Sequence, residues 1–407
     1  MKKTLSFIIL LFCFGIQSVY AQWSAIDDYP GINTYGACSF SINTSYYVAG
    51  GVYINGLYEY DVLTNTWSEK TSIPGGFDYR LYLIGFNIGG SAYVGGGNYF
   101  QDENYAKSDF YKYNPIDDSW EAIDDFGGGP RSRAFSCSVG DKGYVIGGTD
   151  GNDDATKEVW EYDSNLDEWT QKANFPTTNS AYTTGFVIDD KIYVAAGSND
   201  IFTSNIGSNS FYEYTPATDT WVQKADVPGP EKYGCAGFSA FNVGYIGGGK
   251  KNDFSFERKF YSYNPSNDSW QEVNDLIFPE NSGVAHSVAG NVGQHVFMGT
   301  GSFHIDNPSA TAFSRSFYTT TRWGLGLEEN HKMINLYPNP STDFIHIENK
   351  GTQENIKLSI KDITGQQVYS SNKIEPTIDI SMLASGLYIL SITDITGNEN
   401  VQQFIKK

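Results

Sequence analysis

The chain has 407 residues, enough for one large domain with a small companion. Aromatic residues make up 15% of it and glycines number 43, whereas only 18% of the residues are charged. This composition favours short strands and tight turns over helices. The formal net charge of −20 argues against binding to nucleic acid or to anionic lipid.

The first 21 residues have the features of a secretory signal peptide. Two lysines precede a nearly continuous apolar run over residues 5–16, and small residues precede an expected cleavage site after Ala21. The run is too short to cross a bilayer, and the sequence contains no later candidate for a transmembrane segment. Cleavage would leave 25 basic and 47 acidic residues, a net charge near −22. We therefore expect an exported, soluble protein.

A repeat of about fifty residues follows the signal peptide. Tryptophans recur at intervals of 44 to 53 residues, and a doublet of small residues follows each of the first six by 26 to 29 residues. The phrase FYKYNPIDDSW at 110–120 returns as FYSYNPSNDSW at 260–270. Each unit predicts four strands, with a turn rich in Asn, Pro, Asp and Ser between the third and the fourth. Four-stranded repeats of this length predict propeller blades.

These features resemble the kelch repeat. The doublets that carry the resemblance are Gly50-Gly51, Gly95-Gly96, Gly147-Gly148, Ala196-Gly197, Gly247-Gly248 and, less regularly, Gly299-Thr300. The resemblance implies an all-β fold with a six-bladed kelch-type propeller over residues 22–323. Trp23 begins a fourth strand that has no third strand before it, so we expect residues 22–27 to complete the last blade and close the ring.

The C-terminal part has no kelch features. After a linker expected at 324–333, residues 334–407 alternate strands with turns and predict a small antiparallel β-sandwich. This part resembles the type A sorting domain of the type IX secretion system. The residues that carry the resemblance include Pro338, Asn339, Pro340, Asp362, Gly365, Gly386, Leu387, Tyr388, Lys406 and Lys407. It implies a Gram-negative cell, recognition by the type IX machinery, and passage through the periplasm to the cell surface or the medium.

Patterns typical of catalytic or metal sites are sparse. We find no catalytic constellation and expect no cofactor. His286, His295 and His304 fall in one repeat, where they are either ordinary strand and loop residues or a metal site. The acidic turn with Asp150, Asp153 and Asp154 is either a solvated loop or a weak candidate for Ca²⁺. The odd cysteines Cys38, Cys137 and Cys235 lie on first strands of non-adjacent blades, so we expect buried thiols rather than disulfides.

The mouth of the propeller channel is the best candidate for a ligand surface. Residues twelve or thirteen positions after the repeated tryptophans should form a ring at the start of the inner strands. They are Tyr35, Arg80, Arg133, Tyr182 and Tyr233, with Ser282 in the sixth repeat. Arginine donors and tyrosine faces suit a sugar or a carboxylate. In the alternative interpretation, the tyrosines pack between blades and the arginines pair with nearby acids.

Three functions fit this sequence. The first is a monomeric binding module for a glycan or a protein partner, which needs no catalytic residues. The second is a sugar mutarotase or epimerase at the channel mouth, because a six-bladed kelch family of sialic-acid mutarotases exists. That chemistry needs a general acid and base, and no clear Glu or His partner accompanies the arginines. The third is a structural surface or adhesin protein. We favour the binding module.

Overall fold

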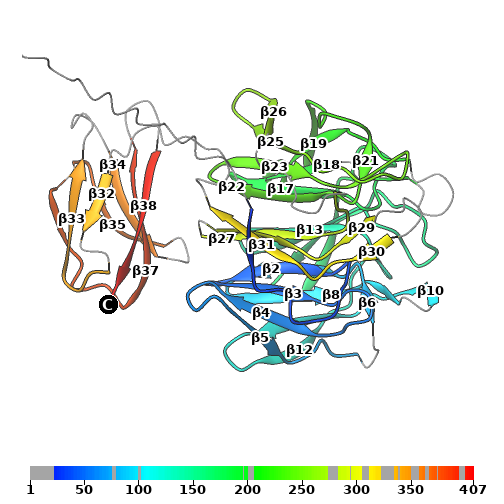
Figure 1. Cartoon of the computed structure of the whole chain (residues 1–407), viewed down its shortest axis with the longest axis horizontal. Helices are drawn as coiled ribbons and strands as arrows, with labels where there is room; N and C mark the ends of the chain where they lie inside the picture. The colour runs from blue at the N-terminus through cyan, green and yellow to red at the C-terminus, as the bar shows by residue number, and fades with distance from the viewer. Residues whose placement is uncertain are drawn as a thin grey trace, which may run out of the picture.

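A computed structural model of the chain consists almost entirely of β-strands (Figure 1). It describes residues 23–75, 79–99, 102–195, 197–199, 206–273, 283–293, 295–304, 311–321, 334–337, 340–349, 357–362, 366–373, 375–393 and 399–407. The predicted signal peptide and linker lie outside these residues. Within the described ranges, the single helical element is a 3₁₀ turn, η1 (Pro216–Thr218). The predicted all-β fold class is confirmed.

The described part of residues 24–321 forms six four-stranded antiparallel sheets, which we call blades 1 to 6. Blade 1 contains β2 (Cys38–Ile42), β3 (Ser45–Ala49), β4 (Leu57–Asp61) and β5 (Thr66–Lys70), and blade 2 contains β7 (Ile84–Ile88), β8 (Ser91–Gly95), β11 (Phe110–Asn114) and β12 (Ser119–Ile123). Blade 3 contains β13 (Phe135–Val139), β14 (Lys142–Ile146), β15 (Val159–Asp163) and β16 (Glu168–Lys172), and blade 4 contains β17 (Thr184–Ile188), β18 (Lys191–Ala195), β19 (Phe211–Thr215) and β20 (Thr220–Lys224). Blade 5 contains β22 (Ala236–Ala240), β23 (Val243–Gly247), β25 (Phe260–Asn264) and β26 (Ser269–Val273).

Blade 6 combines both ends of this region. It consists of β27 (Val288–Val292), β28 (His295–Gly299), β31 (Phe317–Thr321) and the N-terminal strand β1 (Ser24–Ile26), which pairs with β31. The inner strands contact one another in the order β2, β7, β13, β17, β22, β27, and β27 in turn contacts β2. They therefore follow one another around a common axis.

The sequence of each blade reflects a gradient of burial from the axis outwards. Second strands are almost entirely buried, whereas fourth strands are mostly exposed. All second strands end in glycine or alanine except β14, which ends at Ile146. A side chain at Gly247 would meet the Phe260 ring at 2.3 Å, and one at Gly95 would meet Phe110 at 2.4 Å. The small-residue doublet thus admits an aromatic ring from the third strand directly onto the backbone.

Neighbouring blades are joined by a repeated set of hydrogen bonds, which we call the inter-blade staple. Between blades 3 and 4, Ala173 donates its amide to Asp219 at 2.8 Å and accepts the Trp221 indole N–H at 3.0 Å. The hydroxyl of Tyr214 donates to the same carboxylate at 2.6 Å. The same three bonds recur around Asp118, Asp167 and Asp268. The repeated phrase in the sequence therefore encodes contacts between blades.

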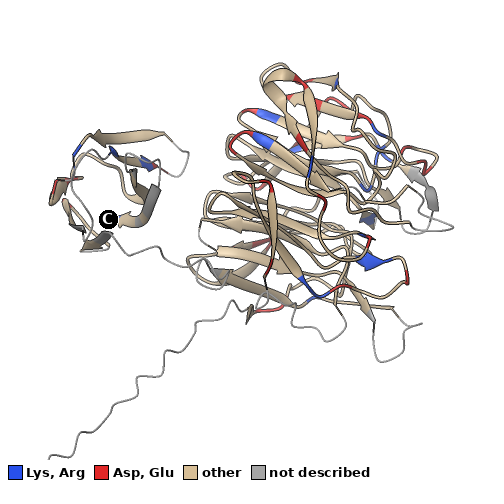
Figure 2. Cartoon of the chain, turned by 90° about the horizontal axis from the view of Figure 1, so that it is seen from above, with Lys and Arg blue, Asp and Glu red and all other residues tan. Residues whose placement is uncertain are grey.

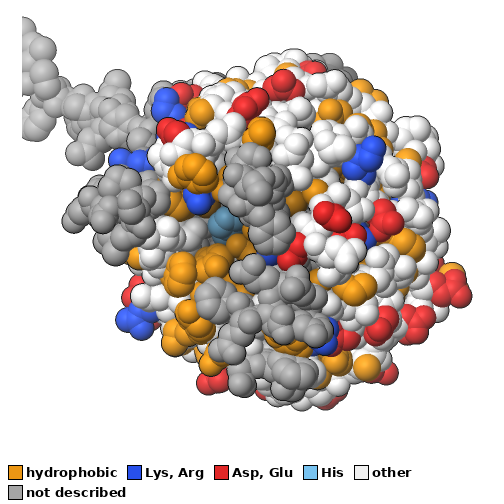
Figure 3. Space-filling model, turned by 90° about the vertical axis from the view of Figure 1, so that its right-hand side faces the viewer, with side chains coloured by type: hydrophobic (Ala, Val, Ile, Leu, Met, Phe, Trp, Pro, Cys, Tyr) orange, Lys and Arg blue, Asp and Glu red, His pale blue; other side chains and the backbone are white. Residues whose placement is uncertain are grey.

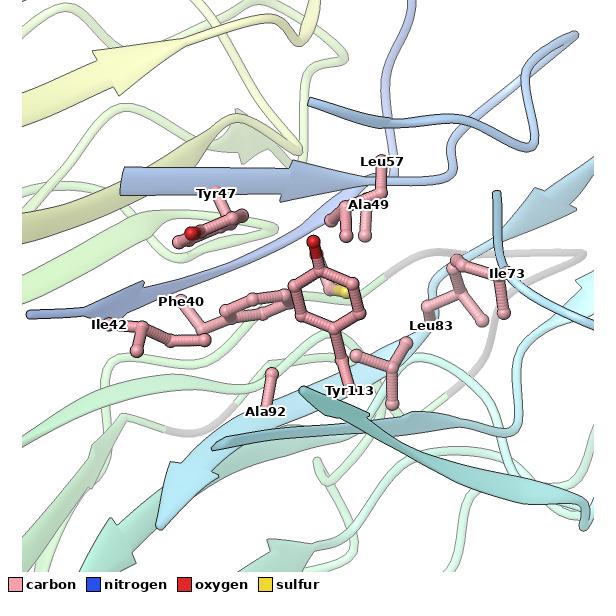
Figure 4. Close-up of a cluster of buried hydrophobic side chains, with 11 residues drawn as sticks. Phe40, Ile42, Tyr47, Ala49, Leu57, Ile73, Leu83, Ala92 and Tyr113 are labelled. Carbon is pink, nitrogen blue, oxygen red and sulfur yellow. The ribbon is translucent and has the colours of Figure 1, made fainter. Parts of the chain in front are cut away.

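Apolar side chains fill the space between adjacent blades (Figure 4). Phe40 and Tyr47 of blade 1 stack at 5.4 Å, and Tyr47 meets Tyr113 of blade 2 at 6.0 Å. Leu83 and Ala92 of blade 2 belong to the same buried cluster. Close aromatic packing of this kind stabilises each blade only when its neighbour is present, as expected for repeat architectures.

Three short ribbons lie beside the inner ends of the blades. They are β6 (Arg80–Leu81), β9 (Asn98–Tyr99) and β10 (Asp102–Ala106); β21 (Lys232–Tyr233) and β24 (Lys250–Lys251); and β29 (Ser302–His304) and β30 (Thr311–Phe313). In the first two ribbons, a strand that precedes the inner strand of a blade (β6 or β21) pairs with the loop that follows the second strand of the same blade. The third ribbon, β29 and β30, lies entirely within the loop that follows β28. The ribbons labelled in Figure 1 are found on the right-hand side of the molecule.

The C-terminal part forms two further antiparallel sheets. One contains β32 (Ile334–Tyr337), β33 (Phe344–Asn349) and β36 (Thr377–Asp379), and the other β35 (Gln367–Ser371), β34 (Lys357–Asp362), β37 (Gly386–Thr393) and β38 (Glu399–Lys406). Their shared core includes Ile345, Ile360, Leu390 and Phe404, all fully buried. Two sheets around one core match the predicted sandwich.

The predicted sorting residues are spread over this second body. Gly386 and Lys406 face each other across β37 and β38, as do Leu387 and Ile405. Tyr388 stacks on Phe404 at 5.5 Å. Asp362 accepts the amide of Gln366, and Lys407 donates its amide to Ser341, next to Pro340. Pro338, Asn339 and Gly365 lie outside the described residues.

Candidate functional site

A residue with left-handed backbone geometry stands two positions before each inner strand. We call these residues the axial ring; they are Gly36, Tyr82, Arg133, Tyr182, Gly234 and His286, with φ between 54° and 65°. The amide of Tyr82 donates to the carbonyl of Gly36 at 2.6 Å, and that of Gly36 to His286 at 3.3 Å. Bonds of the same kind join residues 182 to 133, 234 to 182, and 286 to 234. Left-handed geometry is uncommon for bulky residues and is often retained at functional sites.

The axial ring lines a cavity of about 110 Å³ on the propeller axis. Three aromatic side chains, Tyr82, Tyr182 and His286, line it. Together with Tyr35, Tyr233 and Phe313, which contact them or one another, they form an aromatic group that we call the mouth cluster. Ring centroids of Tyr82 and Tyr182 lie 5.2 Å apart, and those of Tyr182 and His286 lie 4.9 Å apart. Figure 3 looks onto the side that carries the ribbons and shows a hollow with a histidine at its base and hydrophobic side chains beside it.

Arg133 contacts two tyrosines of this cluster, Tyr82 and Tyr182. Its guanidinium lies 5.2 Å from the Tyr82 ring and 5.6 Å from the Tyr182 ring, and its Nε donates to the Tyr182 hydroxyl at 2.9 Å. One terminal nitrogen donates to Asp153 at 2.6 Å and to the hydroxyls of Ser132 and Thr149 at 3.0 Å. The arginine is therefore fully engaged within the protein, and it fixes the orientation of two tyrosine rings.

The groups at the mouth are uncharged near neutral pH apart from the cations beside them. Burial, together with the charges of Lys250 and Arg133, lowers the pKa of His286 well below its usual 6.5. Burial also raises the pKa values of Tyr82 and Tyr233. The mouth thus presents neutral aromatic faces, hydroxyl groups and one neutral imidazole.

Four of the five predicted rim residues meet at the mouth. Arg133 and Tyr182 belong to the axial ring, while Tyr35 and Tyr233 immediately precede its two glycines. Their role in ligand binding remains a prediction. Ser282, the predicted sixth position, lies outside the described residues.

Arg80 does not occupy the predicted position. It is buried and forms a two-bonded ion pair with Asp109, at 2.9 and 2.6 Å. The ring residue of blade 2 is Tyr82. Ring residues lie 13 positions after the tryptophan in four units, but 15 in the second and 16 in the sixth, so a fixed count misses Tyr82 and His286. Counting back two residues from each inner strand would have found both.

The acidic turn does not bring its carboxylates together. Asp153 is buried against Arg133, whereas Asp150 accepts the amides of Asn152 and Asp154. Asp154 is exposed. Within the described residues, no group of three His, Cys, Asp or Glu side chains is arranged to hold a metal ion. The weak calcium candidate therefore has no support from this geometry.

The structure places the three cysteines and two of the three histidines of the sixth repeat, whereas the side chain of His304 lies outside the described residues. Cys38, Cys137 and Cys235 are free thiols, and burial raises the pKa of Cys235 to about 11. His286 lies at the mouth, but His295 begins β28 and stacks on Phe297 at 6.2 Å. No described helix is long and apolar enough to cross a membrane.

Two family models match the chain. A model described as a KLHDC2/KLHL20/DRC7 kelch-repeats domain matches residues 11–197 and 85–301. A model described as a secretion system C-terminal sorting domain matches residues 335–407. The two matches agree with the two bodies seen in the structure.

Curated relatives and a solved structure extend these findings. Kelch-like protein 35 of Mus musculus is 26% identical, over 51% of this chain and 34% of that protein. N-acetylneuraminate epimerase of Pasteurella multocida is 30% identical, over 39% of this chain and 40% of that protein. The chain thus spans less than half the length of these relatives. A structure titled "Structure of YjhT" has a TM-score of 0.61 at 17% identity, covering 72% of this chain and 96% of that one, and shows the shared fold.

Proposed function

Because this chain belongs to the kelch-repeat family and ends in a secretion-system sorting domain, we propose that it is an exported propeller that binds a saccharide at the mouth of its axial channel. The mouth cluster carries the proposal. Three of its six rings, those of Tyr82, Tyr182 and His286, line the cavity, and tyrosine offers both a flat apolar face and a hydroxyl. Sugars present apolar C–H faces and many hydroxyl groups, so they match both features.

The size of the cavity sets how such a ligand would sit. Pockets that enclose a drug-sized ligand measure about 300–1,000 Å³, whereas this cavity measures about 110 Å³. One substituent of a sugar ring fits such a space, and the ring itself would then lie against the tyrosines at the mouth. This arrangement favours a terminal sugar over an internal one. A protein partner would need a flatter surface with a larger contact area.

A glycan-array screen of the mature chain, followed by calorimetry, tests the proposal. We expect Tyr35→Ala to weaken binding about tenfold, because it removes one wall of the mouth. Tyr337→Ala in the sorting domain is the matched control, since Tyr337 is an exposed tyrosine of the other body. Equal binding by the Tyr35 variant would move the site elsewhere, and no binding to any glycan would leave a protein partner or a structural role.

A sugar mutarotase or epimerase is the second candidate. The relative named N-acetylneuraminate epimerase favours it, and so does the neutral imidazole of His286 at the mouth, which could accept a proton. The same protein preparation tests it. NMR would follow the exchange of α and β anomers of each bound sugar. A rate that falls in His286→Asn, a residue that tolerates left-handed geometry, would support catalysis, and a rate equal to that of buffer would refute it.

A further inference from the structure

Most cations near the mouth are already neutralised by the protein. Arg80, Arg131 and Arg133 each approach a carboxylate, that of Asp109, Glu158 and Asp153 respectively, within 2.6 Å. The buried ammonium of Lys232 donates to the carbonyls of Pro228 and Pro230, at 3.0 and 3.3 Å. The three arginines are therefore paired with carboxylates, and the Lys232 ammonium is held by backbone carbonyls.

Lys250 is the exception. It lies on β24, opposite Tyr233 on β21, and so stands beside the mouth cluster. Its Nζ lies 5.1 Å from the centre of the Phe254 ring, and among the described residues it has no carboxylate partner. The side chain is half-buried, and burial lowers its pKa. Because residues paired across an antiparallel ribbon project from the same face, the Lys250 side chain leaves the ribbon on the side of Tyr233.

An anionic partner would stabilise a half-buried ammonium that has only an aromatic ring beside it. Removing a charge from water costs free energy unless an opposite charge or hydrogen bonds compensate for it. The whole protein carries a net charge of −20, and basic and acidic side chains are interspersed over the propeller (Figure 2). Lys250 is therefore a local positive site rather than part of an extended basic surface.

We propose that Lys250 pairs with an oxyanion substituent of the bound saccharide, a carboxylate or a sulfate. This inference rests on the proposed function and names the class of sugar: an anionic one. The aromatic rings would hold the sugar face, while the ammonium holds the anionic group at the edge of the mouth. A neutral sugar would leave the half-buried ammonium unpaired and would bind less tightly.

Matched sugars test this inference on the full mature chain. Calorimetry would compare glucose, glucuronate and glucose 6-sulfate, together with the corresponding galactose series, at low and high salt. We expect at least one anionic member to bind about tenfold more tightly than its neutral counterpart, with a difference that shrinks as salt screens the pair. The uronates and the sulfates separate the two possible sources of the oxyanion.

Three variants assign the effect to this residue. Lys250→Gln should abolish the preference, so that the anionic sugars bind about as tightly as their neutral counterparts, and Lys250→Arg should keep the preference. Lys251→Gln is the matched control, because its side chain leaves the opposite face of the same ribbon. Equal binding of neutral and anionic sugars, or a preference that survives Lys250→Gln, would overturn the inference while leaving saccharide binding intact. Failure of every sugar to bind would refute the proposed function and this inference with it.

Discussion

Arg133 shows how one buried charge can organise an aromatic surface. Its two flanking tyrosines come from blades 2 and 4, and its carboxylate partner, Asp153, comes from a loop of its own blade. Both charged side chains are almost completely buried, with exposed fractions of 7% and 2%. Such a pair contributes little net stability compared with apolar residues, but removal of one partner leaves the other charge uncompensated.

The first prediction therefore concerns Asp153. We expect Asp153→Asn to lower the free energy of unfolding by about 3 kcal/mol, because Arg133 stays charged and buried. Asparagine accepts the left-handed backbone found at this position, so backbone strain does not confuse the result. Urea unfolding measures the change. Asp154→Asn, an exposed neighbour, should change stability by less than about 0.5 kcal/mol. A similar value for both variants would contradict a buried pair.

At the scale of elements, one aspartate of the inter-blade staple stabilises both a turn within its own blade and the contact with the preceding blade. Asp219 has left-handed geometry at the turn before β20 and accepts bonds from Tyr214 of its own blade and Ala173 of the preceding one. Burial acts against the charged carboxylate, but these two donors outweigh it and lower the pKa of Asp219. Blade 1 has Asn65 in the equivalent position, where it accepts the Tyr60 hydroxyl at 3.3 Å.

The second prediction follows from that natural asparagine. Asp219→Asn should cost less than about 1 kcal/mol, because an amide oxygen can accept both bonds. Asp219→Ala should cost about 2 kcal/mol, since it loses the acceptor and places alanine in a left-handed conformation. The pair of variants is its own control, with unfolding followed by tryptophan fluorescence. Equal losses in the two variants would show that the charge, rather than the acceptor and the backbone geometry, stabilises the turn.

The inter-blade staple also explains why the blades could be predicted from the sequence. Tyr214, Asp219 and Trp221 lie within eight residues of one another, so their contacts leave a fixed spacing that recurs in every regular unit. Loops that lead from one blade to the next obey no such constraint, because only their ends are fixed by packing. Tyr82 and His286 lie after loops that are two and three residues longer than the others, and for this reason the count from tryptophan selected Arg80 and Ser282 instead.

At the scale of the whole molecule, the proposed binding site and the sorting domain belong to separate bodies with separate cores. The mouth is built from blades that are linked by staples, whereas the sorting residues lie on sheets with their own buried cluster. The sorting domain could be predicted from its sequence, because its motifs are short and each lies within one turn or one strand. The proposed ligand site could not be predicted in this way, since Tyr233 and Lys250 are brought together only by the pairing of β21 with β24.

The N-terminal strand is the most vulnerable part of this architecture. β1 contributes only three residues to blade 6, but the adjacent Trp23 is 95% buried against Phe238 and Phe260 of blade 5. Tyr29, fully buried, packs against Tyr58 and Trp67 of blade 1. A short segment thus touches both neighbours of the blade that it completes, and its loss would expose the edge of β31.

The third prediction tests this dependence by deletion and addition. A mature chain that lacks residues 23–29 should melt at a lower temperature and associate with itself through the free edge of β31. A synthetic peptide of residues 22–30 should raise the melting temperature again, as any ligand of the native state does. The same peptide with Trp23→Ala should act more weakly, because the deletion of a buried tryptophan side chain costs about 3–5 kcal/mol. Calorimetry measures the three changes in melting temperature, and size-exclusion chromatography measures the self-association. An unchanged melting temperature after deletion would mean that the blades hold together without this strand, and the role of the N-terminal segment would then have to be sought in export rather than in folding.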